Sequence, residues 1–179
     1  MTDKHIFWLY GRSGAGKTTL GELLQLNLTG YGADPCLFLD GDVIRKGVCS
    51  DLGYDQAARD ENHRRIAHMA KLAHQQGFTV VVATIAPEHS QRDIVTSILD
   101  PLEFTWIHVD ASLQTCQERD PKHLYKTKHI GDYPFEPPRT YIPYDEECIR
   151  VSTDESTVGV SISSILRQIR ELDLVNLPI

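Results

Sequence analysis

The chain has 179 residues, a length that suits one domain with a small lid. Apolar residues make up 41% of it, which is enough for one sizeable core and excludes a disordered protein. The net charge of −7 argues against general affinity for nucleic acid, because neutralising a phosphate backbone needs an excess of lysine and arginine. An anionic ligand can still bind where positive charge gathers locally.

Cysteine and histidine spacing predicts no structural metal site. Four cysteines lie far apart with no CxxC pair, so we expect free thiols in a reducing compartment: Cys36, Cys49, Cys116 and Cys148. The eight histidines show no spacing such as HExxH. The first apolar run is too short for a signal peptide, and no stretch approaches the ~18 apolar residues of a membrane span. We therefore expect a cytoplasmic protein with no membrane partner.

Predicted strands and helices alternate along the chain. Short apolar runs predict buried strands over residues 5–10, 36–40, 78–84, 104–110 and 148–152. Apolar residues at helical spacing predict helices over residues 17–28, 56–76, 88–100 and 156–172. This alternation is typical of an α/β domain with a mostly parallel sheet.

Residues 121–145 break this alternation, since they contain five prolines and few periodic apolar positions. A loop of this length inside a compact domain is usually functional, and we interpret residues 120–145 as a lid. Arg119, Lys122, Lys126 and Lys128 form a positive group at its start, which suits closure over polyphosphate. With no internal repeats, we expect a single domain over residues 1–179.

A phosphate-binding loop follows the first predicted strand. Gly11–Thr18 match G-x-x-x-x-G-K-[ST] without a mismatch, and the motif opens the helix predicted from residue 17. The glycines let backbone N–H groups turn toward phosphate oxygens, and the helix points its positive end at them. We expect Lys17 to reach the β- and γ-phosphates and Thr18 to take a Mg²⁺ position. Because no third glycine follows Gly16, the dinucleotide pattern is excluded, and the loop predicts a nucleoside triphosphate site.

Acidic and basic residues that suit an acceptor follow the second predicted strand. Asp40 and Asp42 fall beside the phosphate loop, because ligands of open α/β sheets lie at the carboxyl ends of the strands. One acid could accept a proton from an attacking hydroxyl while the other holds Mg²⁺; the sequence leaves the division open. Arg45 is close enough to meet an anionic acceptor. Arg59 and Asn62 share one face of the next helix and could grip a phosphate or a sugar. We make no functional prediction for Arg64 and Arg65 on that helix.

Together these segments resemble the adenylylsulfate (APS) kinase family, P-loop kinases that move the γ-phosphate of ATP to the 3′-hydroxyl of adenosine 5′-phosphosulfate. The resemblance runs through "GRSGAGKTT", "LDGDVIRKGV", "DLGY…RDENHRRIAHMAKL", "TIAPEHSQRD", "FTWIHVD", "CQERDPKHLYK" and "DYPFEPP". It implies a P-loop NTPase fold with three α/β/α layers, about five mostly parallel strands and a lid. It also implies ATP and Mg²⁺ as cofactors, a small nucleotide acceptor and a homodimer.

The resemblance also implies a role for each matching position. It implies that the catalytic residues are Lys17, Asp40 and Asp42, and that Mg²⁺ is bound by Thr18 and Asp40. It implies that ATP is bound by Gly11, Ser13, Gly14, Ala15, Gly16, Lys17, Thr18, Thr19, Arg119 and Lys126. It implies that the acceptor is bound by Asp42, Arg45, Tyr54, Arg59, Asn62, Ile85, Lys126 and Phe135.

The chain departs from the family pattern in three places. Val43 stands where the family has asparagine, Ala86 where it has serine, and the "FTGID" stretch of the lid is missing. The phenylalanine of that stretch stacks on the acceptor base in the family, and Phe135 or Tyr133 is the candidate to replace it. Adenosine 5′-phosphosulfate is the acceptor that the resemblance favours. A cytidine diphosphate derivative such as cytidine diphosphoramidate stays open, as does a nucleotide-binding module without turnover.

Overall fold

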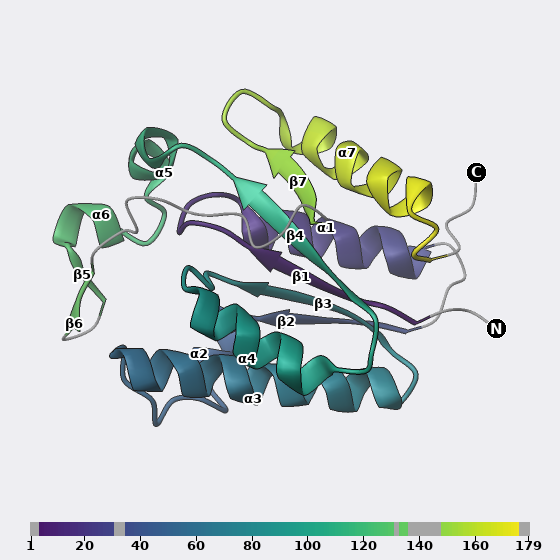
Figure 1. Ribbon diagram of the computed structural model, residues 1–179. Helices are drawn as coiled ribbons and strands as arrows, with labels where there is room; N and C mark the ends of the chain where they lie inside the picture. The colour runs from purple at the N-terminus through teal and green to yellow at the C-terminus, as the bar shows by residue number, and fades with distance from the viewer. Residues whose placement is uncertain (1–3, 31–34, 131–132, 136–147, 176–179) are drawn as a thin grey trace.

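The computed structural model describes residues 4–30, 35–130, 133–135 and 148–175 (Figure 1). Its strands are β1 (Ile6–Tyr10), β2 (Cys36–Asp40), β3 (Thr79–Thr84), β4 (Phe104–Asp110), β5 (His129–Ile130), β6 (Tyr133–Pro134) and β7 (Ile149–Ser152). Its helices are α1 (Lys17–Gly30), α2 (Gly41–Lys46), α3 (Gln56–Gln75), α4 (His89–Leu99), α5 (Leu113–Arg119), α6 (Leu124–Thr127) and α7 (Val158–Glu171).

A five-stranded parallel sheet forms the centre, with the strand order β2-β3-β1-β4-β7. All five residues of β1 are buried, because this central strand is covered by helices on both faces. The order reverses at β1, which lies between β3 and β4 although β2 and β3 follow it in the sequence. Open α/β sheets bind ligands at such a switch point, beyond the carboxyl ends of the strands.

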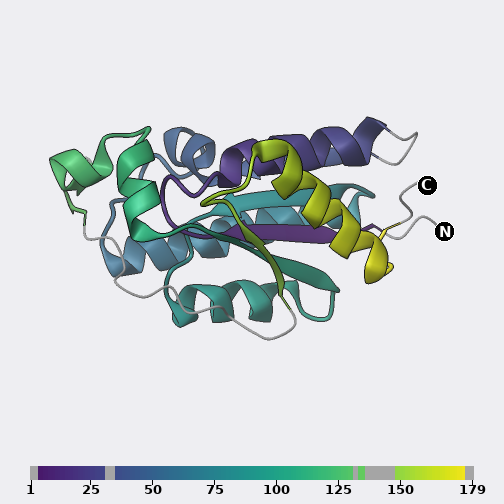
Figure 2. The same ribbon diagram turned by 90° about the horizontal axis from the view of Figure 1, so that it is seen from above.

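Helices cover the two faces of the sheet as separate layers. In Figure 1, α1 and α7 lie above the sheet and α3 and α4 lie below it. The upper core packs Leu20 and Leu24 of α1 with Ile165 of α7, whereas the lower core packs Ile66 of α3 with Val95 of α4. Both views place α5 and α6 beyond the carboxyl ends of the strands, beside the expected ligand site (Figures 1 and 2).

The predicted α/β/α fold is confirmed, and each predicted strand agrees with an observed strand to within one residue at either end. The long helices also lie where the periodicity placed them. Three short helices, α2, α5 and α6, and the β5–β6 hairpin were not predicted, because four to seven residues are too few to show a periodic pattern.

The predicted lid, residues 120–145, is described only in part. Its first residues form α6 and β5, and β6 pairs antiparallel with β5. Residues 131–132 and 136–145 lie outside the described residues, so the lid remains a prediction. In the part of the chain that the structure describes, no helix is long and apolar enough to cross a membrane.

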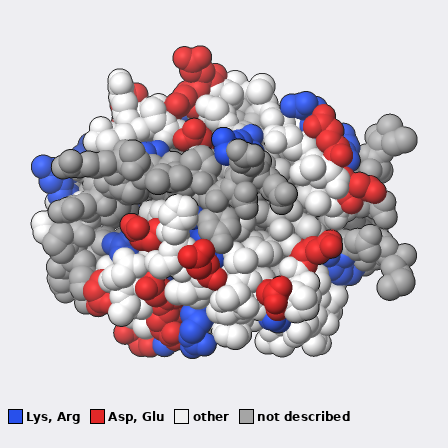
Figure 3. All heavy atoms as spheres, in the orientation of Figure 1, with Lys and Arg blue, Asp and Glu red and all other residues white. Residues whose placement is uncertain are grey.

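Acidic and basic side chains are interspersed on the described surface that Figure 3 shows, most clearly over its lower left part. A mixed surface of this kind accords with the net charge of −7.

Candidate active site

A cavity of about 740 Å³ lies at the carboxyl ends of the central strands. One wall, named the nucleotide wall below, consists of the phosphate-binding loop and the start of α1. A second wall, named the acceptor wall after the predicted acceptor residues in it, comes from α2, α3, the loop between them and the segment after β3, and includes Asp42, Arg45, Tyr54, Arg59 and Ile85. The cavity therefore joins the nucleotide loop and the predicted acceptor residues in one space.

The backbone of the phosphate-binding loop requires glycine at both ends. A Cβ at Gly11 would lie 2.2 Å from the backbone oxygen of Val109, so only glycine fits against the end of β4. Gly16 has a φ of +102°, a conformation that side chains rarely adopt, and a Cβ there would meet no protein atom within 4 Å. The loop thus encloses open space of the kind that polyphosphate fills at a helix N-terminus.

Asp40 and Asp42 lie in different surroundings although only one residue, Gly41, separates them. Thr18 Oγ1 donates a hydrogen bond to Asp40 Oδ2 at 2.7 Å. Asp40 Oδ1 caps α2, accepting from the backbone N–H groups of Asp42 at 2.7 Å and Val43 at 3.4 Å. Both oxygens of the buried Asp40 are therefore fixed, whereas the side chain of Asp42 is half-exposed. The sequence alone could not distinguish the roles of the two aspartates, because the short helix α2 that Asp40 caps was not predicted.

Lys17 lies inside its own loop, where Nζ donates a hydrogen bond to the carbonyl oxygen of Arg12 at 2.7 Å. The pKa of Lys17 is lowered to about 8, first by burial and then by the positive charge of Lys122, while Asp42 and Asp40 act in the opposite direction. The ammonium remains mostly charged at pH 7 and loses its proton just above neutrality.

A residue of the predicted lid segment contacts the half-exposed Asp42. Lys122, between α5 and α6, forms an ion pair with the carboxylate of Asp42 and, like Pro121, lines the cavity. This is the one lysine of the predicted positive group that both lines the cavity and pairs with a predicted catalytic residue, within the described chain.

The two arginines of the acceptor wall are held by the loop between α2 and α3. The Arg45 guanidinium lies 4.6 Å from the centre of the Tyr54 ring, and its Nη1 donates to the carbonyl oxygen of Gly53 at 2.6 Å. Arg59 Nε donates to the carbonyl oxygen of Tyr54 at 2.6 Å. Each arginine keeps further N–H groups that could bind an anion.

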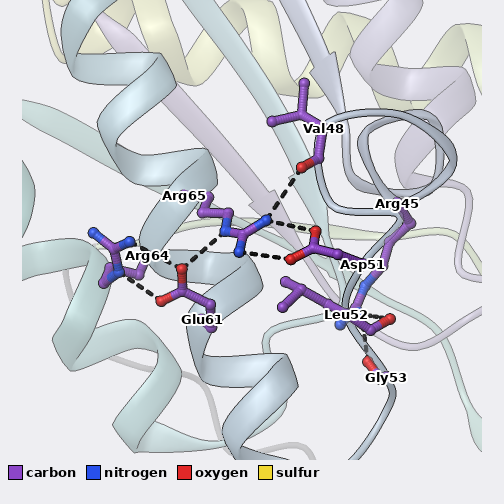
Figure 4. Close-up of polar contacts among 8 residues, drawn as sticks. All are labelled: Arg45, Val48, Asp51, Leu52, Gly53, Glu61, Arg64 and Arg65. Atoms are coloured by element: carbon purple, nitrogen blue, oxygen red, sulfur yellow. Dashed lines mark hydrogen bonds and ion pairs between the residues drawn. The ribbon is translucent and has the colours of Figure 1, made fainter.

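Arg65, for which the sequence supported no functional prediction, fixes that loop (Figure 4). Its guanidinium donates to both oxygens of Asp51, at 2.7 and 2.9 Å, to Glu61 at 2.8 Å and to the carbonyl oxygen of Val48 at 3.2 Å. The preceding Arg64 contacts Glu61 at 2.6 Å and makes no contact with the loop in Figure 4. The network therefore ties the acceptor loop to α3 through one of the two arginines.

The nucleotide wall continues on the other side of the phosphate loop. Arg119 at the end of α5 donates to Thr153 Oγ1 at 3.1 Å, and Thr153 Oγ1 donates to the carbonyl oxygen of Ala15 at 2.9 Å. Thr153 and the nearby Ser156 and Val158 line the cavity. They were not predicted, because no motif precedes α7.

The cavity brings together most, though not all, of the predicted site residues. Those that do not line it are Gly11, Asp40, Asn62, Lys126 and Phe135. Gly11 begins the loop against Val109, and Asp40 accepts a hydrogen bond from Thr18. Phe135 is buried against the ring of Tyr125, with ring centres 5.3 Å apart, and the Lys126 backbone N–H donates to Asp120. Their predicted contacts with ligand stay predictions, and for Tyr133 only the backbone of β6 is described.

Sequence reasoning also missed part of the acceptor wall. Thr84 and Pro87 flank the predicted Ile85 at the end of β3, and His63 and Gln91 lie on α3 and α4. Thr84 and Pro87 could have been found from the strand-end rule that located Asp40. His63 and Gln91 carry no comparable signal.

Neither cysteines nor a residue cluster suggest a further metal centre. All four cysteines are free thiols. Within residues 4–30, 35–130, 133–135 and 148–175, no group of three His, Cys, Asp or Glu side chains could hold an ion.

Comparison with known proteins assigns the chain to a family. A family model described as adenylylsulphate kinase matches residues 3–135. A relative from Aeromonas hydrophila named adenylyl-sulfate kinase is 45% identical over 127 residues, which are 71% of this chain and only 64% of that relative's length. Another of that name, from Marinobacter nauticus, is 37% identical over 178 residues, covering 95% of this chain and 86% of the relative.

A solved structure agrees in fold over nearly the whole length. The Mycobacterium tuberculosis APS kinase CysC in complex with AMPPNP and APS superposes with a TM-score of 0.79 at 27% identity. The match covers 95% of this chain and 99% of that protein. The chain belongs to the adenylylsulphate kinase family.

Proposed function

We propose that the protein transfers the γ-phosphate of ATP to the 3′-hydroxyl of adenosine 5′-phosphosulfate. The observation that carries the proposal is the cavity, in which the phosphate loop faces an acceptor wall with two arginines and an aromatic ring, in a chain of this family. The relatives' name, adenylyl-sulfate kinase, favours this acceptor over a cytidine diphosphate derivative.

The residues present fit ATP and Mg²⁺. The space within the loop at Gly16 suits phosphate, and Lys17 supplies a positive charge for the transferred group. Thr18 and Asp40, whose side chains are hydrogen-bonded, would hold Mg²⁺ through their oxygens. When bound, the ion neutralises charge that develops on the phosphate oxygens.

The two aspartates divide the work in this proposal. Asp40 is buried and fixed by Thr18 and by the cap of α2, so it belongs to the metal side. Asp42 is half-exposed in the cavity, and its carboxylate is available as a base once Lys122 moves to the incoming phosphates. The 3′-oxygen then attacks the γ-phosphorus, its proton passes to Asp42, and the bond to ADP breaks.

The acceptor lies along the second wall. Arg45 and Arg59 bind its 5′-anion, and the Tyr54 ring, already in contact with Arg45, offers a surface to the base. Positioning of two anionic substrates against these charges supplies most of the catalysis. Reaction in the cytoplasm and a homodimer are predictions that complete the proposal.

A steady-state assay of the full chain tests this function. We expect ATP-Mg²⁺ and adenosine 5′-phosphosulfate to give 3′-phosphorylated product, and Lys17→Ala to abolish it while the melting temperature is kept. Cytidine, uridine and guanosine 5′-diphosphate derivatives, including the phosphoramidate, serve as competing acceptors. A higher kcat/KM for any of them than for adenosine 5′-phosphosulfate would overturn the proposed acceptor, and no turnover with any acceptor would overturn kinase activity.

A further inference from the structure

Two buried polar side chains, His63 on α3 and Gln91 on α4, line the cavity. On α4, Gln91, Val95 and Leu99 recur every four residues on the buried face. On α3, His63 and Ala70 belong to the face that is buried in the same core layer. Both helices begin at the carboxyl edge of the sheet, so His63 and Gln91 lie at the end of the contact nearest the cavity, and both line it.

These two side chains leave three buried polar atoms without a hydrogen-bond partner among the described residues. They are His63 Nε2 and both amide atoms of Gln91. His63 is 5% exposed and Gln91 is 0% exposed. Buried polar groups in native proteins are nearly always hydrogen-bonded, so unpaired atoms in the wall of a cavity point to a ligand.

The tautomer of His63 determines which of its ring nitrogens can accept a hydrogen bond. His63 Nδ1 lies 2.8 Å from the carbonyl oxygen of Arg59, which only accepts, so Nδ1 carries the hydrogen. Burial lowers the pKa of His63 to about 4, and the positive charges of Arg45 and Arg59 act in the same direction. The hydrogen bond with the backbone of Arg59 and the negative charge of Asp60 oppose this shift. At neutral pH Nε2 is therefore a bare acceptor, and an N–H group of Gln91 is the partner that suits it.

His63 and Gln91 line the same cavity as Arg59, which is proposed to bind the anionic end of the acceptor. His63 follows Arg59 by one helical turn on α3, and both line the acceptor wall. Gln91 lies in the first turn of α4, just after the cavity residue Pro87. Arg59, His63 and Gln91 therefore line one cavity, which the anionic end of the acceptor shares.

Resting on the proposed function, we infer that Gln91 is a specificity-determining residue that donates a hydrogen bond to an oxygen of the acceptor's terminal sulfate, with His63 as its positioning residue. When the acceptor is bound, one amide N–H of Gln91 turns to His63 Nε2 and the other binds the sulfate oxygen. An amide NH₂ group has two donors, so it can satisfy both acceptors at once.

Two substitutions at Gln91 test the contact. Gln91→Leu removes the amide at similar volume, and Gln91→Glu replaces it with an anion. We expect the KM for adenosine 5′-phosphosulfate to rise about tenfold in Gln91→Leu and more in Gln91→Glu, with the KM for ATP changed less than about twofold. Affinity for adenosine 5′-phosphate, which lacks the sulfate, should not change, as measured by calorimetry.

Stability separates this role from a structural one. Because Gln91→Leu removes two buried polar atoms that are unpaired in the acceptor-free structure, we expect the melting temperature of the acceptor-free variant to equal or exceed that of the wild type, although its KM for the acceptor rises. His63→Leu should raise the KM for the acceptor severalfold. His63→Gln, whose amide oxygen can replace Nε2 as hydrogen-bond acceptor, should restore the wild-type KM.

The outcomes also separate this inference from the proposed function. If the wild type phosphorylates adenosine 5′-phosphosulfate but the Gln91 variants retain its KM, the inference is wrong and the function stands. The inference is also wrong if both variants weaken the binding of adenosine 5′-phosphate as much as that of adenosine 5′-phosphosulfate. It is likewise wrong if Gln91→Leu lowers the melting temperature and changes the KM for ATP together with the KM for the acceptor. A wild type without activity on this acceptor would refute the function itself.

Discussion

The ammonium of Lys17 gives the nucleotide site a pH dependence close to neutrality. Its pKa is lowered to about 8 by burial and by Lys122, well below the value of a free lysine side chain. In the proposed function phosphate binding uses the charged form, because Lys17 would supply the positive charge that meets the β- and γ-phosphates. A lowered pKa means that this charge is lost as pH rises through 8, so activity should fall on the alkaline side.

The size of the effect follows from the pKa. At pH 7 about nine-tenths of the free enzyme carries the charge, and at pH 9 only about one-tenth does. The kcat/KM for ATP, which reports ionisations of the free enzyme, should therefore fall about tenfold between these pH values. Bound phosphates hold the proton on Lys17, so kcat at saturating ATP should fall much less.

Two variants isolate the cause. Lys17→Arg keeps a charge at every pH used and should remove the inflection near pH 8, even where its overall rate is lower. Lys122→Met removes the neighbouring positive charge and should move the inflection to higher pH. Steady-state rates with saturating acceptor provide the measurement. A wild-type kcat/KM that is constant from pH 7 to 9, or an unchanged inflection in Lys17→Arg, would refute this account.

Three further changes probe other parts of the site. Asp42→Asn should lower kcat by about 100-fold or more with little change in the KM for ATP, since it removes the proposed base and keeps a side chain of the same size; an equal effect on kcat and on this KM would place Asp42 in ATP binding. Arg65→Met should raise the acceptor KM by releasing the loop, whereas Arg64→Met, its matched control, should not, and identical KM values would exclude the network from positioning. Gly11→Ala should destabilise the fold by about 2 kcal/mol or more in denaturant unfolding, because its Cβ would collide with Val109; unchanged stability would contradict the backbone described.

Elements could be predicted from sequence where their residue pattern is long or is formed by neighbouring residues alone. The strands are continuous apolar runs because helices cover both faces of a parallel sheet, so each run is visible without its neighbours. The phosphate loop is equally local, since one strand, one turn and one helix build it. The helix α2 was missed because six residues cannot show periodicity, although Asp40 is a typical N-cap residue. Missing α2 also hid the difference between Asp40 and Asp42.

The surroundings of the residues that the sequence could not place depend on how the elements pack against one another. Arg64 and Arg65 are adjacent in sequence, but successive residues of a helix point about 100° apart, so only Arg65 meets Asp51. His63 and Gln91 are polar residues of amphipathic helices and would ordinarily face solvent; packing of α3 against α4 buries both. Because such pairing is decided between helices, a motif identifies the chemistry of the site, and the contacts that select its acceptor depend on the tertiary structure.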